Sequence, residues 1–355
     1  MKKTLFILFA LCLSVVTAQA QQWLLSGFLS EQPMVFNPAV AGTDKEIPVT
    51  LSHRSQWQGL EGAPSTQILT IHGSVNKIGG LGLSLLNDQT GPARQVGAQL
   101  AYSYRLKVRE GMQLAFGIAP MIFQHHLDLA SLTTDEANDP LLAAASESAL
   151  TFDANAGLYV FTDQFSIGFS IPQLLKSKMY FGEDEITSRL HRHYILHGNY
   201  THKINDKFTL QPSAVLRYAY SSPGQGDILV RGIYQEKFFL TAGARISTST
   251  QPTDALLLQG GVKYNQFTLG YGYDYAFTTL HQGSSGSHEI VLRYNIPGDV
   301  KKIKEDESGK GVKSNEGKEV KEGKEVREKK VKEEKVKKEK VKKEKKKKDG
   351  ETTDQ

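Results

Sequence analysis

The 355-residue sequence contains a single cysteine, Cys12. It lies in an apolar stretch at 5–16 that follows two lysines and precedes an Ala-Gln-Ala cleavage signature at 18–20, a pattern typical of a secretory signal peptide. We therefore predict that residues 1–20 are a signal peptide. Because Leu11 rather than a small residue precedes the cysteine, a lipoprotein anchor is not expected. The mature chain then has neither thiol nor disulfide, and its stability must come from strand pairing and burial.

Long hydrophobic runs are missing after the signal peptide. No later stretch approaches the ~20 apolar residues that a membrane helix needs. A membrane-embedded form of this chain therefore has to be a closed barrel.

Motifs for catalysis and cofactor binding are absent as well. The sequence has no glycine-rich phosphate loop, no Gly-x-Ser-x-Gly elbow and no His-Glu-x-x-His. His125 and His126 are adjacent, and adjacent residues of a strand point to opposite faces, which is poor geometry for one metal. His191 and His193 share a face but lack cysteine partners or a carboxylate motif. We predict no enzyme activity, no cofactor and no metal site.

The strongest local pattern is at residues 255–275, where apolar residues alternate with small or polar ones around Asn265 and Gln266. This period of two predicts a β-hairpin. Aromatic residues flank the turn and end the apolar face, as the interfacial girdles of a membrane barrel would place them. A soluble β-sandwich shows the same alternation, so the hairpin alone favours neither.

The same pattern recurs along the chain. Most of the predicted strands are near the ~9 to 11 residues that a tilted strand needs to cross a bilayer. The strands are predicted at 48–57, 65–76, 79–87, 94–107, 111–124, 149–161, 164–171, 191–203, 207–220, 227–235, 237–247, 254–264, 267–276 and 288–296.

Short and longer connections alternate between these strands. Short turns are predicted at 76–77, 108–110, 162–163, 205–206, 236 and 265–266, and longer links at 58–64, 88–92, 127–147, 172–190, 221–226, 248–252 and 278–287. Outer-membrane barrels have short periplasmic turns and longer outside loops, whereas a sandwich has no reason to alternate. We therefore predict an all-β chain: a transmembrane antiparallel β-barrel of about 14 strands at 48–296, in contact with the lipid of the cell outer membrane, with both termini periplasmic.

Charged residues of both signs occupy the strand face that would line the lumen. They indicate a lumen crossed by ion pairs and hydrogen bonds rather than a wide pore. We favour the interpretation that they satisfy one another; the alternative is a selective conduit or a docking surface. These residues are Arg105, Asp153, Arg217, Arg231, Arg245, Asp274, Glu289 and Arg293.

Two segments flank the predicted barrel. Residues 21–47 contain Pro33 and Pro38 and predict an irregular periplasmic leader that packs against the rest of the chain. Residues 297–355 are rich in lysine and glutamate and predict a disordered or solvated-helical periplasmic tail. No aromatic residue is interleaved in the tail for stacking on bases, so nucleic acid is not an expected partner.

Two neighbouring motifs carry a family resemblance. Phe-Asn-Pro-Ala-Val-Ala-Gly at 36–42 precedes Arg-Ser-Gln-Trp-Gln-Gly-Leu-Glu-Gly-Ala-Pro at 54–64. With further matches up to residue 296, the chain resembles the PorP/SprF family, outer-membrane proteins of the Bacteroidetes type IX secretion system. The stretch at 23–30 departs from the family's usual Ser-Gln-Tyr lead. The motif residues are Asn37, Pro38, Gly42, Arg54, Trp57, Gly59, Glu61, Gly62 and Pro64.

The second motif suits a tight loop at the rim of a barrel. Gly59, Gly62 and Pro64 fix unusual backbone angles, Trp57 sits where an interfacial aromatic would, and the arginine that opens the motif can pair inside the barrel. We predict scaffold roles first, with partner contact through Trp57 or Glu61 as the alternative.

The resemblance implies a function in protein export. Such barrels support secretion or surface attachment of a large adhesin-like protein with a C-terminal sorting domain, and they work beside periplasmic components of the secretion system. The alternative function is a passive outer-membrane channel or transporter for a small solute.

Overall fold

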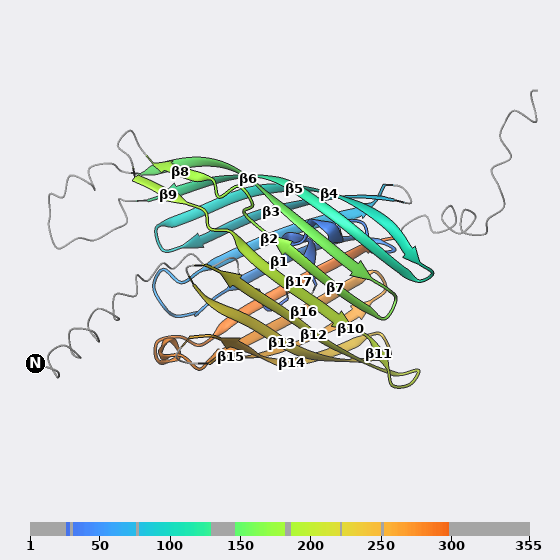
Figure 1. Ribbon diagram of the computed structural model, residues 1–355. Coiled ribbons are helices and arrows are strands. Elements are labelled where there is room, and N and C mark those ends of the chain that lie inside the picture. The colour runs from blue at the N-terminus through green and yellow to red at the C-terminus, as the bar shows by residue number, and fades with distance from the viewer. Residues whose placement is uncertain are drawn as a thin grey trace, which may run out of the picture. The chain divides into compact units, whose positions relative to one another are not determined.

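A computed structural model describes residues 26–28, 31–75, 78–128, 146–181, 186–220, 222–249 and 252–297. They form a closed antiparallel β-barrel of 14 strands (Figure 1), which confirms the predicted fold class. The barrel strands are β1 Ile47–Ser55, β2 Ser65–Ser74, β3 Gly79–Thr90, β4 Ala93–Arg109, β5 Met112–Leu127, β6 Glu147–Phe161, β7 Phe165–Ile171, β10 His193–Tyr200, β12 Phe208–Ala219, β13 Ser222–Tyr234, β14 Phe238–Ser247, β15 Thr253–Tyr264, β16 Phe267–Ala276 and β17 Ser287–Ile296.

Three shorter strands complete the described part of the chain. β11 (His202–Lys203) follows β10 and also pairs with β12, while β8 (Lys178–Phe181) and β9 (Ile186–Arg189) form a separate two-stranded sheet. This small hairpin lies within the predicted link at 172–190. Among the described residues, no helix is long and apolar enough to cross a membrane. The predictions for the signal peptide and the tail fall outside the described residues.

The barrel is a meander in which each strand pairs with its neighbours along the chain. The pairing of β1 with β17 joins the first and last strands, and the pairing of β10 with β12 completes the ring. At the β1–β17 seam, Arg54 is opposite Glu289 and Thr50 is opposite Arg293. Since every barrel strand has a partner on both sides, the backbone polar groups of the wall can all be satisfied within the sheet.

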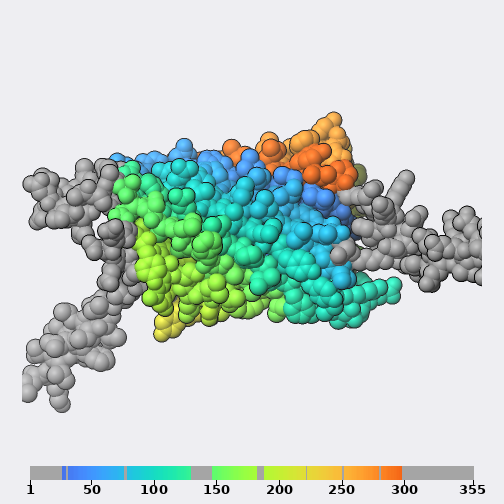
Figure 2. All heavy atoms as spheres, turned by 90° about the horizontal axis from the view of Figure 1, so that it is seen from above, coloured from blue at the N-terminus to red at the C-terminus, as the bar shows by residue number. Residues whose placement is uncertain are grey.

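Side chains alternate between the lumen and the outer surface, as the period of two predicts. In the β15–β16 hairpin, Leu257 is fully buried, whereas Leu256 and Leu258 are 38% and 42% exposed. In Figure 2 the outer wall is seen where orange β17 lies beside blue β1 and the next strands follow toward green. The apolar outer face requires a hydrophobic surrounding, which a bilayer supplies.

Aromatic side chains gather on the outer surface near one end of the barrel. The ring of Phe208 lies 4.8 Å from that of Tyr234, and the ring of Phe267 lies 4.7 Å from that of Tyr294, measured between centroids. Phe208, Tyr234 and Phe267 are terminal residues of their strands, and Tyr294 lies opposite Phe267, two residues before the end of β17. They form the aromatic girdle that marks a membrane interface.

The connections assign two different ends to the barrel. We call the end with the β2–β3, β4–β5, β6–β7, β13–β14 and β15–β16 turns the short-turn end and the opposite end the loop end. Two predicted long links at the loop end are wrong. β3 continues to Thr90 and β4 starts at Ala93, while β12 ends at Ala219 and β13 starts at Ser222. The polar residues that suggested loops there continue the hydrogen-bonded ladder instead.

The leader at 31–46 occupies the barrel (Figure 1), where it includes the 3-10 helices η1 (Pro33–Val35) and η2 (Pro38–Val40). Its last residues reach the mouth, where Lys45 is 86% exposed. Ser26 Oγ donates a 2.5 Å hydrogen bond to Glu289 Oε1, close to the loop end of β17. Gly42 N donates to His72 Nδ1 at 3.2 Å, close to the short-turn end of β2. The leader therefore runs through the lumen from the loop end to the short-turn end.

Candidate functional site

The middle of the leader is held by the asparagine of the first motif. Asn37 accepts a hydrogen bond from Ala39 N at 3.1 Å, which caps η2. Its Nδ2 donates to Leu158 O at 3.0 Å and lies 2.9 Å from His197 Nε2. The imidazole of His197 in turn stacks on the ring of Tyr159 at 5.6 Å. One buried amide thus joins the leader to β6 and β10.

Small residues on the inner wall let the leader approach the strands. A Cβ at Gly157 would lie 2.0 Å from Asn37 Oδ1, and one at Gly117 would lie 2.1 Å from Ala39 N. Either side chain would have to displace the leader. The other inward glycines that crowd the leader are Gly80, Gly82, Gly168, Gly270 and Gly272.

Wall side chains also bind the leader backbone. Gln99 Nε2 donates to Met34 O at 3.2 Å, and Ser103 Oγ donates to Ala41 O at 2.5 Å. Arg105 Nη1 donates to Gly42 O at 2.5 Å. Gly42 has a φ of +70°, and a Cβ there would lie 2.7 Å from Gly73 O, so this motif position requires glycine.

A chain of buried charges crosses the lumen toward the loop end. Arg54 bridges Glu289 (3.3 Å) and Asp274 (2.7 Å), and Arg245 bridges Asp274 (3.5 Å) and Asp227 (2.8 Å). Arg217 Nη2 ends the chain on Asp227 Oδ2 at 2.5 Å. We call these six residues the charge relay. All are at most 6% exposed, and three positive charges balance three negative ones.

A second set of charges lies nearer the short-turn end. Arg231 pairs with Glu31, and Arg293 Nη2 donates to Asp44 Oδ2 at 2.9 Å. Burial raises the pKa of Glu31, but the guanidinium groups of Arg231 and Arg293 outweigh this and hold that pKa below its usual value. A polar cavity of 200 Å³ lies between these groups and the wall of β10, β12 and β14.

The predicted lumen charges all face inward, and they have three kinds of partner. Arg217, Arg245, Asp274 and Glu289 belong to the charge relay, and Arg231 and Arg293 hold the leader through its carboxylates. The last two predicted charges bind backbone instead. Asp153 accepts from Leu175 N at 2.9 Å and Ser177 N at 3.1 Å, and Arg105 holds the carbonyl of Gly42.

The second motif forms a loop that is clamped by its neighbours. Gln56 N donates to Pro64 O at 2.9 Å, and Gly91 N donates to Gly62 O at 2.8 Å. Gly59 and Gly62 have φ values of +104° and +69°, which glycine tolerates best. These hydrogen bonds tie the loop to its own base and to the β3–β4 turn at the loop end.

The two side chains of this loop with a predicted alternative role in partner contact are both accessible. Glu61 is exposed, and Trp57 is half-buried with a φ of +49°, which is unusual for a bulky residue. Trp57 N donates to Ser287 Oγ at 3.1 Å, which ties this backbone to the start of β17. Arg54, the first motif residue, instead points inward to the charge relay.

Sequence reasoning missed three carboxylates that pair with the lumen arginines. Asp227 is the first residue of a predicted strand and was not counted among the inward residues. Glu31 and Asp44 lie in the leader, and no local sequence pattern places the leader in the lumen. The available signal was an excess of arginine over acid among the predicted inward residues, since buried guanidinium groups need partners.

Several solved structures are similar to this chain at low sequence identity. They include a Pseudomonas aeruginosa FadL homologue, with 12% identity, a TM-score of 0.41 and coverage of 73% of this chain and 91% of that chain. The Ralstonia pickettii toluene transporter TbuX has 12% identity, a TM-score of 0.44 and coverage of 74% and 92%. The Pseudomonas putida toluene transporter TodX has 10% identity, a TM-score of 0.41 and coverage of 75% of this chain and 93% of that chain. These likenesses carry no argument about function, and no curated protein is significantly similar.

The comparison with protein families identifies the family of this chain, which the structural comparisons do not. The model of the type IX secretion system membrane protein PorP/SprF matches residues 18–294. This range includes both motifs, the leader in the lumen and nearly the whole barrel, and it confirms the resemblance seen in the sequence. The chain therefore belongs to the PorP/SprF family of type IX secretion system membrane proteins.

Proposed function

We propose that this protein is an outer-membrane accessory of the type IX secretion system that supports secretion or surface attachment of a large adhesin-like protein with a C-terminal sorting domain. Family membership supports the role in secretion. The leader at 31–46 supports an accessory role rather than a conduit, because it occupies the lumen through which a cargo chain would pass. We assign the protein no enzymatic step; its partners are the cargo and the periplasmic components.

We further propose that the loop end faces the cell exterior and the short-turn end faces the periplasm, as in other outer-membrane barrels. β17 ends at Ile296 on the short-turn end, which agrees with the predicted periplasmic carboxyl terminus. Ser26, in contrast, lies near Glu289 toward the loop end. In this orientation residues 26–28 lie at the outer mouth and β17 ends on the periplasmic side. The prediction that both termini are periplasmic concerns chain ends outside the described residues and stays a prediction.

The rival function is a passive channel for a small solute. The polar cavity beside Glu31 measures 200 Å³, less than the ~300 to 1,000 Å³ of most small-molecule sites. A solute path through the barrel would also require the leader to move. The rival therefore predicts conductance that depends on leader displacement.

A disulfide lock separates the two functions, and the predicted mature chain has no cysteine to interfere. A Cβ at Gly82 would lie 2.1 Å from Met34 Sδ, so cysteines at these two positions are within reach of each other. A strain lacking the gene would be complemented with Met34→Cys/Gly82→Cys, with each single variant as control. Surface labelling and mass spectrometry would then quantify proteins with C-terminal sorting domains.

The accessory function gives three results: deletion removes one or more such surface proteins, the locked variant restores them, and the unmodified barrel is silent in planar bilayers. Normal surface display in the deletion strain would refute it. Solute-dependent conductance that the disulfide abolishes would establish the channel instead.

A further inference from the structure

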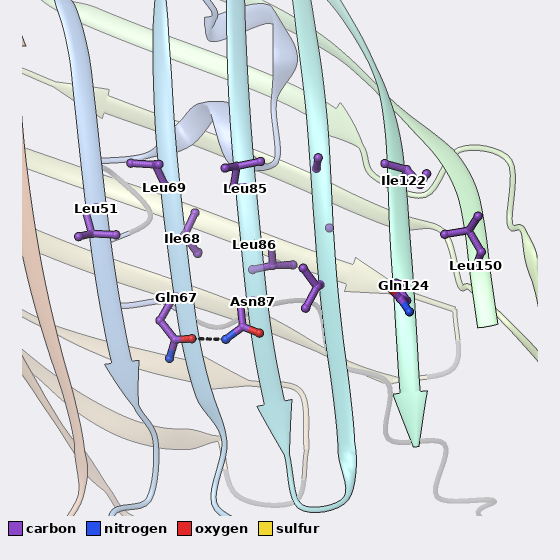
Figure 3. A pocket seen from close by; sticks show the side chains of 13 residues that line it. Leu51, Gln67, Ile68, Leu69, Leu85, Leu86, Asn87, Ile122, Gln124 and Leu150 are labelled. Carbon is purple, nitrogen blue, oxygen red and sulfur yellow. Dashed lines mark hydrogen bonds between the residues drawn. The ribbon is translucent and has the colours of Figure 1, made fainter. Parts of the chain in front are cut away.

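The outer wall has a groove on the side of β1 to β6. It measures 480 Å³, and Figure 3 shows Leu51, Leu69, Leu85, Ile122 and Leu150 along it, from five different strands. These side chains belong to the outward-facing set. Ile68 and Leu86, which also line the groove, alternate toward the lumen. Since the exposed leucines and Ile122 point outward, the groove opens to the bilayer.

Polar residues border the groove toward the loop end. Asn87 Nδ2 donates to Gln67 Oε1, Gln67 Nε2 lies 3.1 Å from His53 Nδ1, and Arg94 Nε donates to Asn87 Oδ1 at 2.9 Å. We call these four residues the rim row. They link the outer faces of β1 to β4 by hydrogen bonds across the strands. Gln67 and Asn87 also line the groove.

The rim row carries a cation without a carboxylate on the same face. Arg94 is exposed and has five N–H donors, of which Nε is used by Asn87. The acidic residues on the described strands β1 to β6 are Asp88, Glu147 and Asp153, and all three occupy lumen-facing positions. On the outer faces of these described strands Arg94 therefore has no carboxylate beside it, and the exposed Glu61 lies in the adjoining loop rather than on the wall. The free N–H donors of Arg94 can bind an anion at the membrane surface.

The other side of the barrel differs at the same height. There β10, β12 and β16 present Tyr194, Tyr218 and Tyr275 on their outer faces near the loop end. These are ordinary interfacial aromatics. At these three described positions the outer face is aromatic, whereas at Arg94 it is basic.

We propose that the groove and the rim row bind lipopolysaccharide, a phosphorylated lipid of the outer leaflet. An acyl chain lies in the groove against Leu69 and Leu85, and a phosphate oxygen accepts hydrogen bonds from Arg94. Guanidinium groups suit phosphate because they donate two parallel hydrogen bonds. The site rests on the orientation proposed above, in which the loop end meets the outer leaflet.

The test uses the full mature chain, purified in mild detergent, stripped of lipid and checked for folding by its heat-dependent gel mobility. Native mass spectrometry would measure binding of lipid A, of dephosphorylated lipid A and of phosphatidylglycerol. The variant Arg94→Gln removes the charge and is matched by Lys178→Gln, an exposed cation of β8 at the same end. Ala98→Trp fills the groove and is matched by Ala242→Trp on the outer face of β14.

We expect lipid A to bind wild type, and Arg94→Gln to weaken that binding about tenfold, the value of one hydrogen bond to a charged group. Ala98→Trp should weaken it as well, while both matched controls bind normally. Equal binding of dephosphorylated lipid A, or equal effects of the paired variants, would overturn the site. Preference for phosphatidylglycerol over lipid A would also overturn it and would point to reversed orientation, without touching the proposed role in secretion.

Discussion

Asp227 is the residue on which the charge relay depends most. It is 2% exposed and accepts from Arg217 Nη2 at 2.5 Å and from Arg245 Nε at 2.8 Å. Arg245 has a second carboxylate, since Asp274 lies 3.5 Å away. For Arg217, Asp227 is the ion-pair partner within the described residues. The change Asp227→Asn therefore leaves a buried guanidinium with no counter-charge and gives the relay a net charge of about +1.

We expect Asp227→Asn to lower the free energy of unfolding by about 3 to 5 kcal/mol, the usual cost of breaking a buried ion pair from one side. The assay is reversible urea unfolding in lipid vesicles, followed by tryptophan emission and by the gel mobility of the folded barrel. Asp274→Asn is the matched control. This variant should lower the free energy of unfolding by less, because Arg54 still has an ion pair with Glu289 and Arg245 still has one with Asp227.

A double variant tests whether the cost comes from the unpaired charge. Arg217→Met/Asp227→Asn removes both partners and leaves Arg245 beside Asp274. We expect it to recover most of the loss, since replacing a whole buried pair by neutral groups is often nearly neutral. An Asp227→Asn barrel within about 1 kcal/mol of wild type, or a double variant as unstable as the single one, would refute the reasoning.

Three further outcomes are expected from the fold. Gly157→Val should push the leader off β6 and expose it to protease, unlike Gly260→Val, whose Cβ would have no neighbour closer than 3.8 Å; equal digestion of both would contradict this. Leu258→Arg on the lipid face should cost about 2 to 4 kcal/mol in vesicle unfolding, and no cost would argue against a membrane there. Gln235→Asn/Glu236→Gly should raise the urea midpoint, because both residues have positive φ (52° and 56°) at the centre of a turn that Lys237 N closes by donating to Tyr234 O; a lowered midpoint would contradict this.

The strands could be predicted from the sequence because each has one face toward lipid and one toward a polar interior. This forces a period of two on residues such as those of the β15–β16 hairpin, and the pattern is readable without knowing any partner. The ends of some strands differ from the prediction. The backbone pairing of β3 with β4 continues to Thr90 and Ala93, beyond the point where the sequence becomes polar. Polar residues at the rim of the barrel form backbone hydrogen bonds as well as apolar residues do.

The partners of the lumen charges could not be predicted in the same way. The inward face of Arg217 or Arg245 follows from alternation, but the choice of Asp227 depends on how adjacent strands are staggered, and no local pattern encodes that. Arg54 is instructive, since the motif suggested that it can pair inside the barrel. Its two carboxylates, Asp274 and Glu289, come from strands more than 200 positions away along the chain.

The position of the leader follows from the size of the barrel. About eight strands enclose a space that side chains alone can fill, whereas sixteen or more leave a channel. A ring of 14 strands falls between these limits, so its lumen needs additional chain. Gly117 and Gly157 are placed where the leader touches the wall, and charged residues fill the lumen where it does not. The leader is thus part of the core of this barrel, and a barrel built without residues 31–46 should lose stability and gain conductance together.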